Sequence, residues 1–357
     1  IPFTWLEAMI WLLLIAVILS RKLDFKKIRK DYFFWLILFL LAVVSVAVYI
    51  SPDKLHALGA FKAYFLEPIF YYFLIISLIK ERREIEGLFW ALGFSVLYLG
   101  LFAIGQKIWP IGVPAGFLTA SGSADRVTSV FGYPNAIGLF FGPIIVAFLG
   151  FLYYQNPDSL LLYFSNKSRF WFKFLVVVIG TLSLVLAQSE GAIIAVIVCG
   201  CLMSFCNKKT RWYLLSAGLI FIVFFIFNWL GLRDFLWPKL WLLDWSGYVR
   251  RSMWLETFNM LKDNWFWGVG LAGYKLAIIP YHINVWFETF PYPHNILLNF
   301  WSELGLLGLV TFGLITIKFW WLNFKNFFSI AWCFSHNLPF DKLASIVFLF
   351  VALEMII

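Results

Sequence analysis

Ten apolar stretches, each close to the length of one membrane crossing, occupy most of this chain. A helix that spans the hydrocarbon core needs roughly 20 apolar residues. The stretches lie near residues 5–20, 32–51, 62–79, 87–109, 134–154, 171–187, 191–206, 212–230, 294–317 and 343–357. Only 13% of the residues are charged, against about a quarter in soluble domains. We therefore predict an all-α polytopic membrane protein with about ten transmembrane helices in one membrane domain, 1–357.

The net charge of +9 is concentrated in the short connectors between these stretches. The basic clusters are Arg21, Lys22, Lys26, Lys27, Arg29 and Lys30, then Lys80, Arg82 and Arg83, then Lys167, Arg169 and Lys173, then Lys208, Lys209 and Arg211. An excess of Lys and Arg marks cytoplasmic loops, so this charge argues against nucleic acid as a partner. Alternation then places 52–61, 110–133, 188–190 and 231–293 outside the cytoplasm.

The ends of the sequence suggest that more of the protein exists. The chain begins at Ile1 rather than at Met and stops at Ile357 inside an apolar stretch. We expect a fragment that lacks one or more helices at each end.

The outside segment 231–293 is far longer than an ordinary connector. Its many tryptophans argue against disorder, so we expect it to fold back onto the membrane surface. Within it we predict a helix over residues 248–262 that places Arg250, Trp254, Thr257 and Leu261 on one face. Asp263-Asn264 ends this helix, and Gly268-Val269-Gly270 forms a turn.

His294 is the most informative candidate residue. It follows Pro293 at the start of the helix expected over 294–317. As a functional group it would be a general base, because only histidine is close to half-neutral around pH 7 without tuning. The alternative is a polar cap at the water interface. Glu303, about two turns further on, is either a functional membrane acid or a hydrogen-bond acceptor for neighbouring backbone.

Three arginines outside the membrane are candidates for binding phosphate. Arg250 and Arg251 lie on the predicted amphipathic helix, where a guanidinium fork suits a phosphate but also suits snorkelling. Arg126 lies in a Gly- and Ser-rich loop that leads into a helix opened by Pro134. It is placed either to help bind an anion at that helix start or to pair with Asp125.

No cofactor or metal is predicted. The chain has no Asp-x-Asp, no Gly-rich phosphate loop ending in Gly-Lys-Ser/Thr and no His-Glu-x-x-His. Cys199, Cys201 and Cys206 share one apolar stretch and Cys333 lies in a late connector. Small buried hydrophobic residues are the expected role of these cysteines, and they imply no disulfide framework.

Four segments in order resemble the O-antigen ligase and O-antigen polymerase superfamily of bacterial envelope glycosyltransferases. They are Arg126 to Gly138 with Pro134-Asn135-Ala136-Ile137-Gly138; Ser189-Glu190-Gly191-Ala192; Arg250-Arg251-Ser252-Met253-Trp254 on to Asp263 and Gly268-Val269-Gly270; and His294-Asn295 to Gly308. The resemblance covers roughly residues 60 to 320. It implies a GT-C-like architecture in the bacterial cytoplasmic membrane, with lipopolysaccharide biosynthesis as the setting.

The resemblance also implies the chemistry. A lipid-linked oligosaccharide, carried on undecaprenyl pyrophosphate, would donate its glycan to a hydroxyl of a glycan, lipid or protein acceptor outside the cytoplasm. His294 would remove the acceptor's proton, and Arg250 would steady the departing pyrophosphate, with Arg126 in a similar role. We further expect Arg251, Asn135, Asn295 and Glu303 to contact substrate.

The sequence departs from the family at the hairpin, where the usual Ser-Arg-Gly is Ser189-Glu190-Gly191. Arg251 is a candidate to replace the missing cation. Ligase and polymerase share these motifs, and we favour the ligase slightly. A flippase or transporter for a polyprenyl-linked solute is the alternative from another class, and a structural partner of an envelope assembly is a third.

Overall fold

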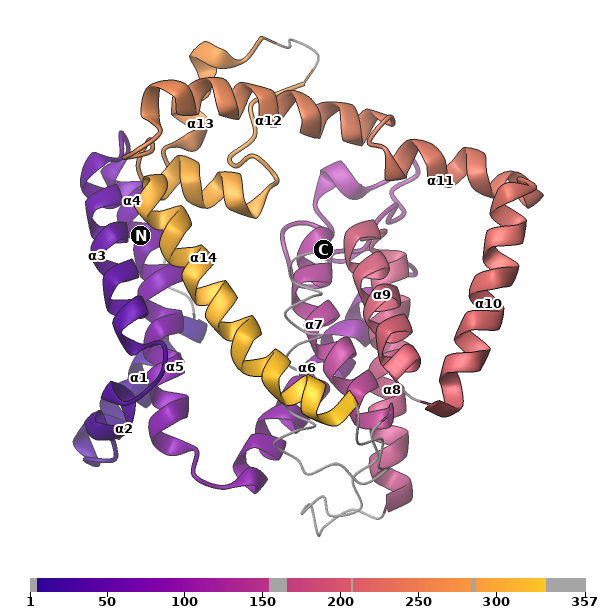
Figure 1. Cartoon of the computed structure of the whole chain (residues 1–357), viewed down its shortest axis with the longest axis horizontal. Coiled ribbons are helices and arrows are strands. Elements are labelled where there is room, and N and C mark those ends of the chain that lie inside the picture. Colours follow the sequence, from indigo (N-terminus) through magenta and orange to yellow (C-terminus); the bar gives the residue numbers. More distant parts are fainter. Residues whose placement is uncertain (1–4, 154–165, 207, 284–286, 332–357) are drawn as a thin grey trace. The chain divides into compact units, whose positions relative to one another are not determined.

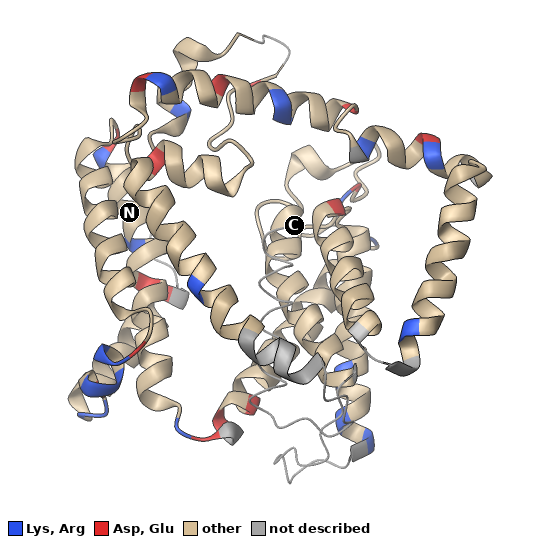
Figure 2. Ribbon diagram, in the orientation of Figure 1, with Lys and Arg blue, Asp and Glu red and all other residues tan. Residues whose placement is uncertain are grey.

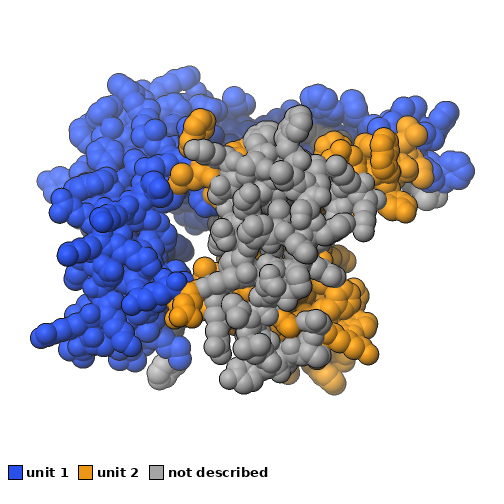
Figure 3. Space-filling view, turned by 60° about the horizontal axis from the view of Figure 1, so that its bottom comes forward, with its two compact units in different colours: residues 1–80, 222–319 blue, residues 81–221, 320–357 orange. Residues whose placement is uncertain are grey.

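The computed structural model describes residues 5–153, 166–206, 208–283 and 287–331. These residues form helices joined by turns (Figure 1), with one isolated β-bridge between Leu118 and Ala124. The chain divides into two compact units, which Figure 3 colours separately. Unit 1 comprises Ile1–Lys80 and Ile222–Phe319, and unit 2 comprises Glu81–Phe221 and Trp320–Ile357. The single membrane domain expected from the sequence stays a prediction.

Unit 1 contains the helices at both sides of the long outside segment. They are α1 (Trp5–Leu19), α2 (Phe25–Arg29), α3 (Phe34–Ile50), α4 (Lys54–Phe61), the π-helix η1 (Lys62–Leu66), α5 (Glu67–Leu78), the 3-10 helix η3 (Trp229–Gly231), α11 (Leu232–Leu240), α12 (Trp245–Asn264), α13 (Tyr274–Ala277), the 3-10 helix η4 (Ile279–Tyr281) and most of α14 (Ile296–Ala331). Unit 2 contains α6 (Arg82–Gly105), the 3-10 helix η2 (Ala115–Phe117), α7 (Asn135–Tyr153), α8 (Asn166–Leu186), α9 (Glu190–Cys206) and most of α10 (Lys208–Ile226).

α3 is the frame on which the later part of unit 1 packs. The helix ends at Ile50 because Ser51 precedes Pro52, and a residue before proline is driven into an extended conformation. Its buried side chains Val43, Val44 and Ala47 form one core with Ala57, Leu271 and Leu304. The turn that follows α12 and the start of α14 are therefore fixed to α3 and α4.

α14 runs antiparallel to α3. At one end, the amide of Leu271, in the turn beside α14, donates to the carbonyl of Ala47 at 3.1 Å, near the carboxyl end of α3. At the other end, Lys318 Nζ on α14 donates to the carbonyl of Tyr32, just before α3 begins. The basic residues of α2 lie at this second end (Figure 2), and Lys27 Nζ bonds the carbonyl of Ile79 after α5 at 2.9 Å.

In unit 2, as in unit 1, the basic residues and the candidate site residues lie at opposite ends of the helices. Its core is built largely from α7, α8 and α9, with Phe141, Ile145 and Leu184 fully buried. α8 begins beside Lys167 and Arg169, and at its far end the carbonyl of Leu186 accepts from the amide of Val127 at 3.3 Å. The loop that carries Arg126 therefore lies at the end of α8 opposite its basic start.

Five helices in the described part of the chain are long and apolar enough to cross a membrane: Lys54–Leu78, Glu84–Gly105, Asn135–Leu152, Lys167–Leu186 and Ile296–Phe324. Four shorter apolar helices are Glu7–Leu19, Phe34–Ile50, Glu190–Phe205 and Thr210–Ile226. The helical, multi-pass character is confirmed, while the count of ten is not. The stretch predicted at 343–357 lies outside the described residues.

Two boundaries differ from the prediction, and two agree. The chain over 54–61 was expected outside as a loop, but it is helical and runs directly into the span that ends at Leu78. The helix expected over 294–317 starts at Ile296 and is interrupted at Gly305. The tight hairpin at 188–190 is confirmed, and so is the helix predicted over 248–262, which extends from Trp245 to Asn264.

Candidate active site

His294 lies in a tight turn directly before α14. Its backbone φ is +48°, in the left-handed region that is uncommon for residues other than glycine but in which histidine is enriched. Asn295 then caps the helix, because its Oδ1 accepts from the amides of Leu297 and Leu298 at 3.1 and 3.2 Å. The helix begins after His294 rather than at it, since a left-handed residue cannot continue a right-handed helix.

The His294 side chain is exposed and contacts two aromatic rings edge-on. Its ring centroid lies 4.6 Å from that of Tyr292 and 5.4 Å from that of Phe290. Neither ring nitrogen makes a hydrogen bond to any residue that the structure describes. Both nitrogens are therefore available to a bound molecule.

Arg250 is the charged group that acts on His294. The pKa of His294 is lowered from its ordinary value of 6.5, mainly because neighbouring groups partly desolvate the ring and further because of the positive charge of Arg250. Both effects favour the neutral imidazole, which is the form that can accept a proton. The structure thus brings together the two residues that the sequence predicted as catalytic.

α12 fixes the spacing between these two residues. The helix begins at Trp245 because the side chain of Asp244 accepts from the amide of Gly247 at 3.0 Å. Trp254, four residues after Arg250 and so on the same face, donates its Nε1–H to the carbonyl of Pro293 at 3.0 Å. This bond fastens the residue before His294 to the helix that carries Arg250.

Arg250 and Arg251 are both exposed on α12. Neither makes a hydrogen bond or an ion pair with a described residue. Their guanidinium groups, which suit bidentate contacts to phosphate oxygens, are not engaged by the described part of the protein itself.

The turn after α12 inserts into a break in α14. Gly305 has φ +70° and ψ −171°, and Gly268 in the facing turn has φ +69°. Across the break, the amide of Val269 donates to the carbonyl of Ser302 at 2.7 Å, and the amide of Leu306 donates to that of Phe266 at 2.9 Å. These bonds replace helical ones, so the two glycine motifs form one interlocked element.

Glu303 lies two residues before the break at Gly305 and close to the same facing turn. Its carboxylate accepts a hydrogen bond from the backbone of Ala272, so it is a hydrogen-bond acceptor for neighbouring backbone, one of the two roles considered from the sequence. Its contact with substrate stays a prediction, as does that of Asn295, which the structure shows capping α14.

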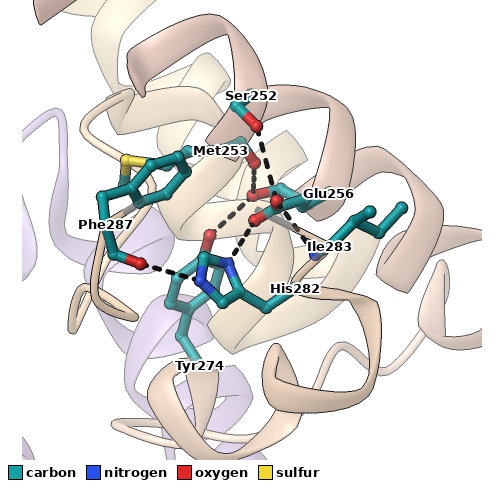
Figure 4. A network of polar contacts seen from close by, with 8 residues as sticks. Ser252, Met253, Glu256, Tyr274, His282, Ile283 and Phe287 are labelled. Atoms are coloured by element: carbon teal, nitrogen blue, oxygen red, sulfur yellow. Dashed lines mark hydrogen bonds and ion pairs between the residues drawn. The ribbon is translucent and has the colours of Figure 1, made fainter. Parts of the chain in front are cut away.

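A second polar cluster on α12, shown in Figure 4, was not foreseen from the sequence. Glu256 is 4% exposed, and its Oε2 lies 3.0 Å from Nδ1 of His282. The other nitrogen of His282, Nε2, lies 3.0 Å from the carbonyl oxygen of Phe287. One signal was available in the sequence: Glu256 lies beside Met253 and Thr257 on the buried face of an amphipathic helix, where a carboxylate needs a partner.

Thr257 extends this cluster toward α13. Its hydroxyl lies 2.7 Å from that of Tyr274, and burial raises the pKa of Tyr274 to about 12. Tyr274 therefore stays protonated at neutral pH, and it packs α13 against α12.

In unit 2, Arg126 is held across the end of the α8–α9 hairpin. Its Nε donates to the carbonyl of Ala187 at 2.9 Å, and its Nη2 donates to Oδ1 of Asn135 at 2.9 Å and to the carbonyl of Gln188 at 3.2 Å. It makes no ion pair with Asp125 among the described residues. Arg126 and Asn135, both predicted to contact substrate, are thus direct partners.

Close packing explains the glycine of the Pro-Asn-Ala-Ile-Gly segment. A Cβ at Gly138 would collide with Oγ of Ser189 and lie 2.9 Å from Cβ of Ala192. α7 therefore approaches the hairpin closely at the position where Glu190, exposed in the first turn of α9, replaces the family's arginine. A carboxylate is favourable there because of the helix dipole.

The predicted site residues fall into two groups, one in each unit. His294, Arg250, Arg251, Asn295 and Glu303 belong to unit 1, while Arg126 and Asn135 belong to unit 2. Among the described residues, no group of three or more His, Cys, Asp or Glu side chains could hold a metal ion.

Comparison with known proteins gives one family. Residues 175–313 match the family model described as O-antigen ligase (Wzy_C), a segment that includes the hairpin, α12, His294 and Glu303 but neither Arg126 nor Asn135. No protein with a curated description matches the chain. The match confirms the resemblance to the O-antigen ligase and polymerase superfamily, and it supports a ligase- or polymerase-type function in a membrane protein of lipopolysaccharide biosynthesis.

Proposed function

We propose that this chain, of which residues 175–313 match the O-antigen ligase family model, moves a glycan from an undecaprenyl-pyrophosphate donor to an acceptor hydroxyl outside the cytoplasm. The acceptor oxygen attacks the anomeric carbon of the donor, and the bond from that carbon to the pyrophosphate oxygen breaks. The acceptor's proton passes to His294. The negative charge passes to the departing pyrophosphate.

The environment of His294 is the observation that carries this proposal. Its two ring nitrogens make no hydrogen bond within the described part of the chain, and its pKa is lowered from 6.5 by partial desolvation and by Arg250. Such a histidine is neutral at physiological pH and can take a proton from a hydroxyl within hydrogen-bond reach. Its left-handed backbone is an unfavourable conformation, of a kind that clusters at active sites and ligand clamps.

The exposed guanidinium groups of α12 support the other half of the reaction. The charge that develops on a leaving pyrophosphate is stabilised by donors already in place, and such electrostatic terms are usually the largest in catalysis. Arg250 is close enough to His294 to change its pKa. A phosphate bound by Arg250 would therefore lie near the base, and Arg251 offers a second cation on the same helix.

The arrangement of unit 1 supports an active site outside the cytoplasm. The turn that follows α12 lies at the carboxyl end of α3, while the basic connector with α2, and Lys318, lie at the amino end. Basic connectors face the cytoplasm. With that orientation, the turn that follows α12 faces the opposite side of the membrane, and Trp254 ties the segment before His294 to α12.

Unit 2 gives an independent argument of the same kind for Arg126. The loop that carries it lies at the end of α8 away from Lys167 and Arg169. By the same rule, Arg126 and Asn135 face outward, and we propose that they contact the donor's pyrophosphate or glycan. In the absence of an arginine at the hairpin, Arg126 is the guanidinium group that we expect this loop to contribute.

The test compares envelope glycans in a strain that lacks the gene and carries either the wild-type chain or a variant. We expect His294→Ala to abolish transfer at an unchanged protein level. Arg250→Lys should lose most activity, because a point charge cannot replace a bidentate fork, and loss of one such stabilising contact slows a reaction by about 10²–10³-fold. His56→Gln, which alters an exposed histidine on α4, is the matched control.

Mass spectrometry of the accumulated material separates the possible outcomes. Full-length lipid-linked chains that remain unattached indicate a lost ligase, whereas single-repeat products indicate a lost polymerase. Full transfer in His294→Ala would remove the proposed base. Movement of a lipid-linked glycan across liposome membranes without any transfer product would favour a flippase.

A further inference from the structure

The segment between η4 and α14 is attached to α12 at two described points. At the first point, His282 lies beside Glu256. At the second, Pro293 accepts the indole hydrogen of Trp254. Along α12, Arg250 and Glu256 are separated by about 9 Å, at 1.5 Å per residue. One short stretch of helix therefore carries both anchors and the cation next to His294.

The geometry of His282 shows what the first anchor requires. Nδ1 faces a carboxylate oxygen of Glu256 and Nε2 faces the carbonyl oxygen of Phe287, each at 3.0 Å. A carbonyl and an ionised carboxylate can only accept hydrogen bonds, so both nitrogens must donate beside them, and only the imidazolium does so. The ion pair is also well shielded, with side-chain exposures of 16% for His282 and 6% for Glu256.

Glu256 holds both sides of this anchor. Its Oε1 lies 3.4 Å from the hydroxyl of Ser252, one turn earlier in α12, and 3.4 Å from the amide of Ile283. The carboxylate is thereby positioned by its own helix while it bonds two successive residues of the segment (Figure 4). Charge-assisted hydrogen bonds are about twice as strong as neutral ones.

We propose that the Glu256–His282 ion pair, with the Trp254–Pro293 hydrogen bond, is a positioning device that holds His294 beside Arg250. This inference rests on the proposed function, because it matters only if His294 is the base. His282 itself does not take the acceptor's proton, since neither of its nitrogens is free. His282 thus positions the segment, whereas His294 accepts the proton.

The protonation of His282 makes the anchor depend on pH. The groups that face it are Glu256 from α12 and, further off, Tyr274 from α13, whose pKa of about 12 keeps it neutral. The hydrogen bond to Glu256 raises the pKa of His282 above 6.5. The contribution of His282 is therefore fully present below pH 6.5, as long as Glu256 is ionised, and it is lost as the pH rises through the raised pKa of His282. We expect this loss to set the upper limit of the active pH range.

The decisive measurement is the pKa of His294 itself, by NMR of the purified full chain labelled at histidine. The chain has 4 histidines, and each signal is assigned by a His→Gln variant. We expect Glu256→Gln and His282→Gln to release the segment, so that His294 moves away from Arg250 and its pKa rises toward 6.5. His282→Arg keeps a cation with several donors and should retain the lowered value.

Two further variants probe the second anchor and provide a control. Trp254→Phe removes only the indole donor and keeps an aromatic ring, so it probes the second anchor even where the Glu256 variants do not fold. His56→Gln should leave the titration of His294 unchanged. An unchanged pKa of His294 in Glu256→Gln, or in both His282→Gln and Trp254→Phe, overturns the proposal.

Transfer rates add a readout that separates this proposal from the proposed function. With a synthetic polyprenyl-pyrophosphate glycan as donor, release of the anchor should lower kcat by about 10–100-fold, as small misplacements of a catalytic group do, with little change in KM for the donor. His282→Arg should keep kcat close to that of the wild type and remove the decline of kcat at high pH. If His294→Ala retains transfer, the proposed function fails, while the titration of His294 still decides whether the anchor positions it.

Discussion

Substitution of Gly305 by alanine tests whether the break in α14 is built by the turn that inserts into it. Gly305 has φ +70°, and a left-handed conformation costs a residue with a Cβ about 1–2 kcal/mol. The added Cβ would lie 2.6 Å from the carbonyl carbon and 2.8 Å from the carbonyl oxygen of Trp267. These atoms belong to the backbone, so the turn must move away.

That movement breaks the two hydrogen bonds across the break, Val269 to Ser302 and Leu306 to Phe266. Each contributes about 0.5–1.5 kcal/mol. Together with the backbone term, we expect Gly305→Ala to destabilise the protein by about 2–5 kcal/mol. Transfer activity should fall as well, because the same turn helps to fix the start of α14, directly after His294.

The assay is thermal unfolding of the purified protein in one detergent at one scan rate, with Gly313→Ala as the control. A Cβ at Gly313 meets no atom within 4 Å, and alanine within a helix is favoured over glycine by about 0.5–1 kcal/mol. The control should therefore be unchanged or slightly more stable. Equal midpoints for the two variants would refute the reasoning, because only one of the two positions lies at the break.

Two other predictions concern the site and its surroundings. In Arg250→Gln, loss of the positive charge should let the pKa of His294 rise back toward 6.5. Because the neutral ring is the base, the rising limb of kcat against pH should move to higher pH. A limb that does not move would show that Arg250 does not act on His294. In Gly138→Ala, contact with Ser189 should force α7 away from the hairpin at a cost of about 1–3 kcal/mol, seen as a lower unfolding midpoint with Gly218→Ala, at an open position, as control.

The sequence was sufficient to predict features that depend on local chemistry. The polar Gln188-Ser189-Glu190-Gly191 between two apolar stretches predicted the hairpin between α8 and α9, because one helix of that combined length is too long for a single crossing. The periodicity of Arg250, Trp254, Thr257 and Leu261 predicted α12, and the His-Asn pair predicted a helix start within two residues of the observed one.

Features that depend on tertiary contact could not be predicted in this way. Gly305 lies inside one predicted apolar span, and a glycine in such a span does not by itself distinguish a break from a continuous helix. The break is stabilised by backbone groups of the distant turn at Phe266 and Val269. The pairing of Glu256 with His282 joins residues 26 apart through the path of an irregular segment. No periodicity in the sequence encodes that path.

The two histidines of this segment show how one residue type acquires opposite properties. His282 meets an acceptor at each nitrogen, so its charged form is stabilised. His294 meets no acceptor among the described residues, and its pKa is lowered by partial desolvation and by the nearby cation Arg250, so its neutral form is favoured. α12 contributes to both effects, with Glu256 bonded to one ring and Arg250 acting on the other. Between the two pKa values, one histidine is charged and holds the segment, and the other is neutral and can accept a proton.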